Sequence, residues 1–161
     1  PVVGAAARAT RRVSPADADA AQARLAPVLA REAMMLQPYL ASVETTGEWS
    51  VLIIDGEPTH AGRKVPGAGD YRVQDDFGAH DEPLEMTAEL RALAAKVVGA
   101  AQGYLLRTMP FLYGRVDLLH HDGGWVLNEL EVIEPSLFFR HGPEAAERLA
   151  DAVMALAAEG R

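Results

Sequence analysis

The stretch R-V-D-L-L-H-H-D-G-G-W-V-L-N-E-L-E, residues 115–131, indicates how the second half of this chain folds. Its centre, Asp122-Gly123-Gly124, is typical of a turn that joins two antiparallel strands. We therefore predict a β-hairpin over roughly 111–133, with a three-residue loop at these positions.

Charged residues recur at every second position on both arms of this hairpin. Because side chains alternate faces along a strand, Arg115 and Asp117 share one face, and Glu129 and Glu131 share one face. The three-residue loop would set Asp117 opposite Glu129 and Arg115 opposite Glu131. Three carboxylates directed at one spot repel each other unless a cation lies among them. Hard oxygen ligands favour Mg²⁺, so we predict a divalent-metal site and phosphate chemistry.

The alternative is a solvated sheet face on which the acidic residues have no function. Apolar neighbours argue against it, because carboxylates beside apolar side chains are costly unless paired or metal-bound. Four apolar residues alternate with the charges and are expected to bury the opposite face: Val116, Leu118, Leu130 and Val132. Three more are expected beside the charges, as the floor of a pocket: Leu119, Leu127 and Ile133.

Basic residues near this site have two interpretations each. Arg115 is either a salt-bridge partner or a clamp for phosphate, since a guanidinium grips phosphate oxygens in two places. The segment around Arg63, Lys64, Arg72 and Gln74 is either an exposed basic loop or a source of cations for phosphoryl transfer. Alternation allows only one of Arg63 and Lys64 to point inward. The stretch Gly4–Thr10 is either an ordinary turn or a weak phosphate-cradling loop.

The remaining elements predict an α+β fold with mostly antiparallel sheets packed against helices. Strands are expected at 34–37, 48–55 and 58–65, and a structureless loop at 66–83. Helices are expected after Ser14-Pro15, after the capping residue Thr87, and after Gly142-Pro143. The last helix is expected to bury Ala146, Leu149, Ala150, Val153 and Met154.

Composition narrows the class of protein. The chain has 161 residues, a net charge of −8 and no cysteine, which excludes disulfides and thiolate chemistry and fits a cytoplasmic protein. The acidic balance argues against nucleic acid as a partner. No apolar run is long enough for a membrane span. The five histidines show no metal-ligand spacing, and oligomerisation, including a homo-oligomer, stays open.

Several segments together resemble the ATP-grasp superfamily, specifically its glutathione synthetase-like ligases. R-V-D-L-L followed by L-N-E-L-E-V-I-E-P is similar to the family's Asp strand and its E-x-N-x-x-P segment. The resemblance implies metal ligands at Asp117, Glu129 and Glu131, with Glu131 standing where Asn is common. It also places Arg115 at the transferred phosphate.

Other segments extend the resemblance over nearly the whole chain. L-Q-P-Y-L resembles the hinge that binds adenine, which implies nucleotide contacts from Gln37, Pro38, Tyr39 and Leu40. Glu48 falls where relatives contact the ribose. A-G-D-Y-R-V-Q resembles a segment that places Arg72 at the acyl phosphate or substrate, and Lys64 is the further catalytic candidate.

The resemblance also implies an organisation. About 1–40 is expected to form a smaller nucleotide-clamping lobe, and about 41–161 a larger lobe for metal and phosphate. The start at Pro1 resembles the segment directly after the family's ATP-binding lysine strand. We therefore expect an N-terminal substrate-binding domain to be missing from this sequence.

The implied reaction is an ADP-forming ligation of a carboxylate to an amine, or sometimes a thiol, through an acyl phosphate. The implied cofactors are ATP and two Mg²⁺ ions, with Mn²⁺ as a substitute, and the implied partners are small-molecule carboxylates and amines. Peptide bond formation, glutathione-type condensation and cyclisation all stay open, and the segments also look like those of a cycloserine-forming cyclo-ligase. The alternatives are a metal-dependent hydrolase and a non-catalytic nucleotide-binding module of the same fold.

Overall fold

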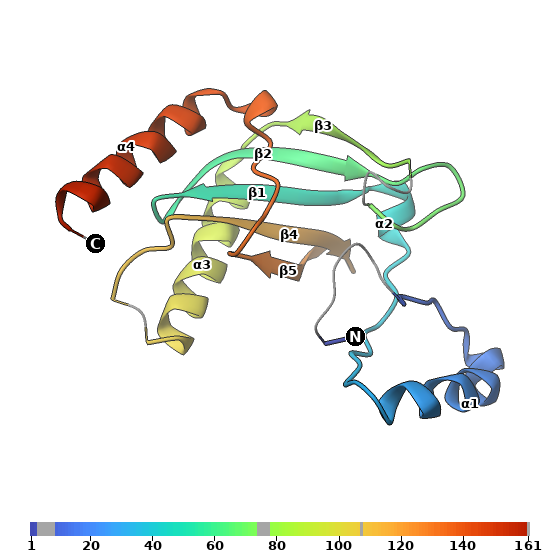
Figure 1. Cartoon of the computed structure of the whole chain (residues 1–161). Coiled ribbons are helices and arrows are strands. Elements are labelled where there is room, and N and C mark those ends of the chain that lie inside the picture. The colour runs from blue at the N-terminus through green and yellow to red at the C-terminus, as the bar shows by residue number, and fades with distance from the viewer. Residues whose placement is uncertain (3–8, 74–77, 107, 161) are drawn as a thin grey trace.

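The central strand β1 (Glu48–Ile54) is covered on both faces, which explains its apolar run V-L-I-I. Val51, Leu52, Ile53 and Ile54 have no exposed surface. The computed structural model describes residues 1–2, 9–73, 78–106 and 108–160 of the chain. Within them the strands form one antiparallel sheet in the order β3-β2-β1-β4-β5, as the α+β expectation requires (Figure 1).

The other strands agree with the predictions except at the edges. β2 spans Glu57–Val65, β4 Tyr113–His121 and β5 Gly124–Glu131. The edge strand β3 (His80–Leu84) forms inside the stretch expected to be structureless. It contains Pro83, which an edge strand tolerates because one side of its backbone has no partner strand. The strand expected at 34–37 is not found: within the described ranges this segment pairs with no strand, and Leu36 is 95% exposed.

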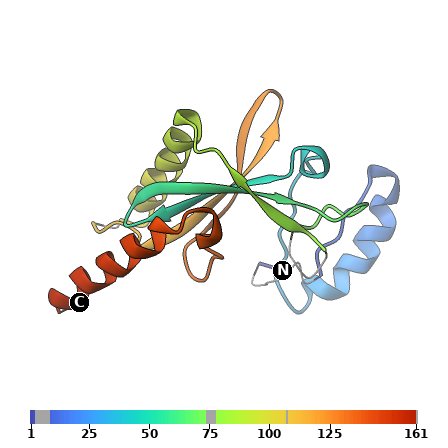
Figure 2. The same ribbon diagram turned by 90° about the horizontal axis from the view of Figure 1, so that it is seen from above.

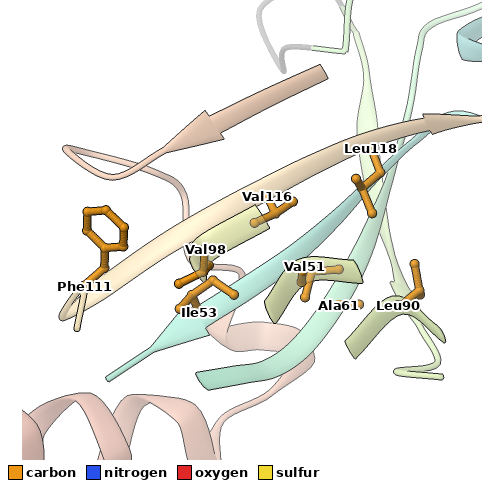
Figure 3. Packing of buried hydrophobic residues seen from close by; sticks show 9 residues of the cluster. Val51, Ile53, Ala61, Leu90, Val98, Phe111, Val116 and Leu118 are labelled. Atoms are coloured by element: carbon orange, nitrogen blue, oxygen red, sulfur yellow. The ribbon is translucent and has the colours of Figure 1, made fainter. Parts of the chain in front are cut away.

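Helix α3 (Ala88–Tyr104) covers one face of the sheet, and α4 (Glu144–Ala158) lies on the opposite face (Figure 2). As predicted, the Thr87 side chain caps α3 by accepting a hydrogen bond from the Leu90 backbone N–H. Leu90, Ala94 and Val98 of α3 pack on Val51, Ile53, Ala61, Val116 and Leu118 to form the hydrophobic core (Figure 3). Each large side chain buried in this way stabilises the fold by about 1.5–3 kcal/mol.

Helix α4 begins where predicted but buries less than predicted. Its Ala145 is buried, whereas Val153 is 45% and Met154 is 69% exposed. Of the other predicted positions, Ala146 and Leu149 are half-buried and Ala150 is exposed. Ala152 and Leu156 are half-buried instead, so the covered face of the helix is rotated from the predicted one. Short elements complete the chain: η1 (Pro15–Asp17), α1 (Ala18–Leu29), α2 (Ser42–Thr45) and η3 (Phe139–His141). No helix in the described part of the chain is both long and apolar enough to cross a membrane.

A crossing segment, residues 132–141, runs from the end of β5 over the sheet face that carries α4 and reaches β2 and β3 (Figure 1). Phe138 of this segment has a left-handed backbone (φ 45°), which is uncommon for a bulky residue and persists only where surrounding contacts enforce it. The contacts include His60, whose Nε2 bonds the Leu137 carbonyl at 2.8 Å. Asp81 of β3 pairs with both Arg140 and His141.

Replacing Gly142 with alanine is expected to lower the free energy of unfolding by about 1–3 kcal/mol. A Cβ at this position would lie 2.5 Å from His60 Cγ, so the crossing segment or the histidine would have to move. The matched control is Gly99→Ala in α3, where no atom other than those of the neighbouring helix backbone lies within 4 Å of the added Cβ. That change is expected to stabilise the helix by about 0.5–1 kcal/mol. Urea unfolding of both variants checks the opposite signs, and equal effects would contradict the close approach.

Candidate active site

The hairpin of β4 and β5 has the predicted pairs: Asp117 lies opposite Glu129, and Arg115 lies opposite Glu131. The loop differs from the prediction, because His121 pairs with Gly124 and only Asp122 and Gly123 form the turn. Both have positive φ, 47° and 78°, as a tight two-residue hairpin turn requires.

A β-bulge restores the register that the shorter turn would have changed. Leu118 pairs with Leu127 while Asp117 pairs with Glu129, so Asn128 is an extra residue with no partner on β4. The bulge also corrects the prediction for Leu127. It shares the face of Leu118, where it lines an apolar groove with Leu130 and α3, instead of lying beside the charges. Ile133 is 77% exposed and contributes no pocket floor, whereas Leu119 is buried.

Asp117 lies at the centre of a buried network of charges, and its side chain has no exposed surface. It accepts hydrogen bonds from Ser50 Oγ at 2.6 Å, from Lys64 Nζ at 2.9 Å and from Arg115 Nε at 2.9 Å. Burial alone would raise the pKa of Asp117, but Lys64, Arg115 and Ser50 outweigh burial and lower it. Asp117 is therefore an ionised carboxylate that two cations hold.

Lys64 is the inward-pointing member of its pair, as alternation required. Its Nζ donates to Glu48 Oε1 at 2.6 Å as well as to Asp117, and it is 9% exposed. Burial would lower the pKa of Lys64, yet Asp117 and Glu48 raise it, so the ammonium stays charged. Arg63 lies on the other face and pairs with Glu82.

Glu48 is 3% exposed and faces inward. Its Oε1 accepts from Lys64, and its Oε2 accepts from Asn128 Nδ2 at 2.6 Å. Burial and the neighbouring Asp117 raise the pKa of Glu48 against the opposing effects of Lys64 and Asn128. A ribose contact from Glu48 stays a prediction.

Arg115 bridges the two strands of the hairpin. Its guanidinium bonds Asp117 and lies 2.7 Å from Glu131 Oε2, so the salt-bridge interpretation is correct for this structure. The ring of Phe138 lies 5.9 Å from its Cζ. The crossing segment thus covers the guanidinium, and a phosphate contact by Arg115 stays a prediction.

The acidic positions carry more negative charge than the cations beside them neutralise. Four carboxylates, those of Glu48, Asp117, Glu129 and Glu131, face the two cations Lys64 and Arg115, which leaves a net charge of −2 when all are ionised. The residue Glu129 is exposed overall, but its carboxylate is partly shielded from solvent. This desolvation, followed by repulsion from Asp117 and Glu131, raises the pKa of Glu129. A divalent cation would cancel this excess.

The carboxylate oxygens of Asp117, Glu129 and Glu131 are donors that suit Mg²⁺, but they are not arranged around one point in this structure. Within the described ranges, no group of three or more His, Asp or Glu side chains is arranged to hold a metal ion. The oxygens of Asp117 accept hydrogen bonds from Ser50, Lys64 and Arg115 in this structure. Glu129 and Glu131 supply carboxylate oxygens on the same face, which are the donors that Mg²⁺ prefers.

Replacing Glu129 with glutamine is expected to change how stability depends on pH. Because the folded-state pKa of Glu129 is raised, wild-type stability relative to the variant is greatest below the unfolded pKa, near 4.5. The advantage is lost as pH rises through the folded pKa. At neutral pH the glutamine variant is then expected to be more stable, by less than about 1 kcal/mol at this exposed position. Urea unfolding of wild type and variant between roughly pH 4 and 8 measures how the difference in their free energies of unfolding changes with pH. A difference that does not depend on pH would contradict the prediction.

The hinge segment, residues 37–40, meets the same end of the sheet. Gln37 Nε2 donates to Asn128 Oδ1 at 3.4 Å. Tyr39 donates to Glu44, carries the guanidinium of Arg12 at 3.7 Å from its ring centroid, and meets Tyr71 edge-on at 5.8 Å. The N-terminal segment and the loop after β2 therefore both contact the hinge.

The structure places Arg72 in the loop after β2, where its guanidinium bonds Asp70. Its contact with substrate stays a prediction. Residues 4–8 of the glycine-containing stretch and Gln74 lie outside the described residues.

Sequence reasoning missed three residues of the site: Ser50, Asn128 and Phe138. Ser50 is the one hydroxyl in the apolar run W-S-V-L-I-I, and a polar residue inside a buried strand signals a buried partner. Asn128 directly precedes Glu129, but only the register shows that both lie on the charged side. No sequence signal identifies Phe138.

Comparison with known proteins gives three kinds of match. The family model described as "Prokaryotic glutathione synthetase, ATP-grasp domain" matches residues 1–136. The cycloserine biosynthesis protein DcsG of Streptomyces lavendulae is 31% identical over 159 residues, which are 95% of this chain and 52% of that protein. Glutathione synthetase of Agrobacterium fabrum is 31% identical over 106 residues, 66% of this chain and 30% of that protein.

Solved structures agree. The crystal structure of D-cycloserine synthetase DcsG has a TM-score of 0.76 and 32% identity, covering 89% of this chain and 49% of that one. D-alanine–D-alanine ligase from Bacillus anthracis, complexed with ATP, has a TM-score of 0.56 and 23% identity, covering 83% and 46%, and supports the fold alone. The chain thus spans about half the length of DcsG and about a third of that glutathione synthetase.

Proposed function

The chain belongs to the family of prokaryotic glutathione synthetase ATP-grasp domains, and we propose that it carries the ATP-binding and phosphoryl-transfer site of a carboxylate–amine ligase. One observation carries the proposal. The cross-strand pairs Asp117–Glu129 and Arg115–Glu131 gather acidic groups above a buried lysine, on the face that the hinge also meets.

The proposed reaction has two steps. A substrate carboxylate oxygen attacks the γ-phosphorus of ATP, the bond to the β,γ-bridging oxygen breaks, and an acyl phosphate and ADP form. An amine nitrogen then attacks the acyl carbon, the bond from carbon to the phosphate oxygen breaks, and inorganic phosphate leaves as the amine loses a proton. The first step needs little covalent chemistry from the protein, so positioning and charge neutralisation carry it.

The residues divide this work by their chemistry. Lys64 and Arg115 are fixed cations, held by Asp117, that supply positive charge toward phosphate oxygens. Glu129 and Glu131, with Asp117, would hold two Mg²⁺ ions or Mn²⁺, which neutralise the phosphates of the nucleotide when bound. Gln37–Leu40 and Glu48 would contact the nucleoside, and Arg72 the acyl phosphate. Residues 1–40 and 41–161 would then close on the nucleotide from two sides.

ADP release from the full-length protein tests the proposal. The expected result is release that requires Mg²⁺, a carboxylic acid and an amine together, found by screening amino acids and small acids. Release with water alone as acceptor would indicate a hydrolase instead. Binding of Mg–ADP without release under any acid of the panel would indicate a non-catalytic nucleotide-binding module.

A further inference from the structure

The bulge in β5 directs a second polar side chain onto the charged face. Asn128 has no cross-strand partner, and a bulge of this kind re-aims the side chain of the extra residue. Asn128 and Glu129, although adjacent in sequence, therefore both serve the same side of the hairpin. In a regular strand one of them would point to α3.

The re-aimed amide joins two parts of the site, the hinge and the buried charge network. Its Nδ2 donates to Glu48 Oε2 at 2.6 Å, and its Oδ1 accepts from Gln37 Nε2 at 3.4 Å. The orientation of the amide is fixed, because the Glu48 carboxylate here accepts and the Gln37 amino group donates. A chain of hydrogen bonds thus runs from the hinge to Lys64, through Asn128 and Glu48.

We infer that Asn128 is a positioning residue that ties the hinge to the Lys64 ion pair, so that the base end and the phosphate end of the nucleotide site keep a fixed spacing. The inference rests on the proposed nucleotide site and adds a residue to it. Asn128 would not need to touch the nucleotide. It acts by holding Gln37 on one side and Glu48, and through it Lys64, on the other.

The chemistry of the position requires an amide. Glu48 Oε2 needs a donor, because its other oxygen is occupied by Lys64 and the group is buried. Gln37, an exposed residue, presents a donor to the other end of the amide. Asparagine supplies both within one side chain, whereas aspartate would set a second carboxylate against Glu48 and leucine would supply neither.

Deleting Asn128 is the sharpest test, because this residue has no pairing partner on β4. Without it the two-residue turn continues as a regular hairpin, and Asp117 still faces Glu129 while Arg115 still faces Glu131. The deletion thus removes the amide and leaves the cross-strand pairs of the charged residues. Asn128→Leu removes the same two hydrogen bonds and keeps the bulge.

Calorimetry with Mg–ADP is the first measurement on these variants. Affinity is expected to fall about tenfold in both, the effect of about 1.4 kcal/mol in binding. Affinities for adenosine alone and for Mg–pyrophosphate alone are expected to fall less than the affinity for Mg–ADP, because only a ligand that spans both ends depends on their spacing. The control Gln102→Leu removes an amide that bonds Met109 on the far side of the sheet, and it is expected to bind Mg–ADP as wild type does.

A double-mutant cycle separates positioning from a general loss of structure. If Asn128 acts through the hinge, Gln37→Ala and Asn128→Leu have non-additive effects on Mg–ADP affinity. The free energy of unfolding of Asn128→Leu is expected to fall, because Glu48 Oε2 loses its donor, so the affinities are compared under conditions in which every variant is fully folded. Additive effects, or equal losses for ADP, adenosine and pyrophosphate, would overturn the inference.

Backbone order parameters of Tyr39 and Leu40, measured by NMR without nucleotide, give a second and independent readout. They are expected to fall in Asn128→Leu and to stay unchanged in Gln102→Leu. If wild type binds no Mg–ADP, the proposed function fails and these order parameters alone decide whether Asn128 holds the hinge. Unchanged order parameters in Asn128→Leu would refute that role.

Discussion

Asp117→Asn is expected to lower the free energy of unfolding by about 3 kcal/mol, the largest stability effect that this structure predicts for a single charge. The substitution keeps the size of the side chain and removes its charge. Lys64 and Arg115 then lose the carboxylate that both of them contact, in a place with no solvent to replace it. Lys64 keeps Glu48 and Arg115 keeps Glu131, so the cost is the loss of the buried charged contacts that both cations make with this one carboxylate.

Urea unfolding at neutral pH measures this cost, with Glu82→Gln as the matched control. Glu82 also pairs with a cation, Arg63, but at an exposed edge, so its loss is expected to cost less than about 1 kcal/mol. The double variant Lys64→Met with Asp117→Asn is expected to lose less than the sum of the two single losses, because the charges act as a pair. A loss for Asp117→Asn as small as that of the control would show that the network does not stabilise the fold.

Glu129→Ala in the full-length protein is expected to reduce ATP turnover by at least about 100-fold, since one preorganised charged group contributes on the order of 3 kcal/mol to the barrier. Its stability is expected to stay equal to wild type or to rise slightly. The physical reason is that partial burial, and then repulsion from Asp117 and Glu131, disfavour the charge of Glu129 and raise its pKa. Within the cross-strand pair, substitution of Asp117 is thus expected to lower stability, whereas substitution of Glu129 is expected to lower turnover and leave stability intact.

ADP release and urea unfolding on the same preparation check this contrast. Glu134 is an exposed residue just beyond the end of β5. Its replacement by alanine serves as the control and is expected to change neither turnover nor stability. Unchanged turnover in Glu129→Ala would retire the proposed mechanism. A large loss of stability in the same variant would instead show that Glu129 has a structural role.

Local patterns in the sequence were sufficient for most of the elements. Alternation and the Asp-Gly turn predicted the hairpin and its charged pairs, and the helix periods predicted α3 and α4. The errors fall where a distant surface decides. The segment 34–37 pairs with no strand in the part of the chain that the structure describes, while β3 forms from residues of low strand propensity because the edge of β2 accepts them.

In the candidate active site, too, local patterns were predicted correctly and the errors came from features that the sequence does not report. The predicted register was correct for Asp117 and Glu129, although the loop behind it was one residue too long, because the bulge at Asn128 compensates for the shorter turn. Alternation alone then assigned Leu127 to the wrong face. The strand alternates in opposite phase on the two sides of the bulge, so one continuous alternation that is right for Glu129 and Glu131 is wrong for Leu127. Nothing in single-residue propensities reports a bulge.

The amino-acid sequence by itself determined the α+β class, the paired acidic and basic positions of residues 115–131 and the resemblance to ATP-grasp ligases, because these depend on contacts within one hairpin or one helix. Only the tertiary structure decided which charges meet. Lys64 and Asp117 are 53 positions apart in the chain, and they bond because β1 separates their strands and lends Ser50 and Glu48 to the same face. Sheet order sets such contacts, and sheet order depends on how the whole chain packs.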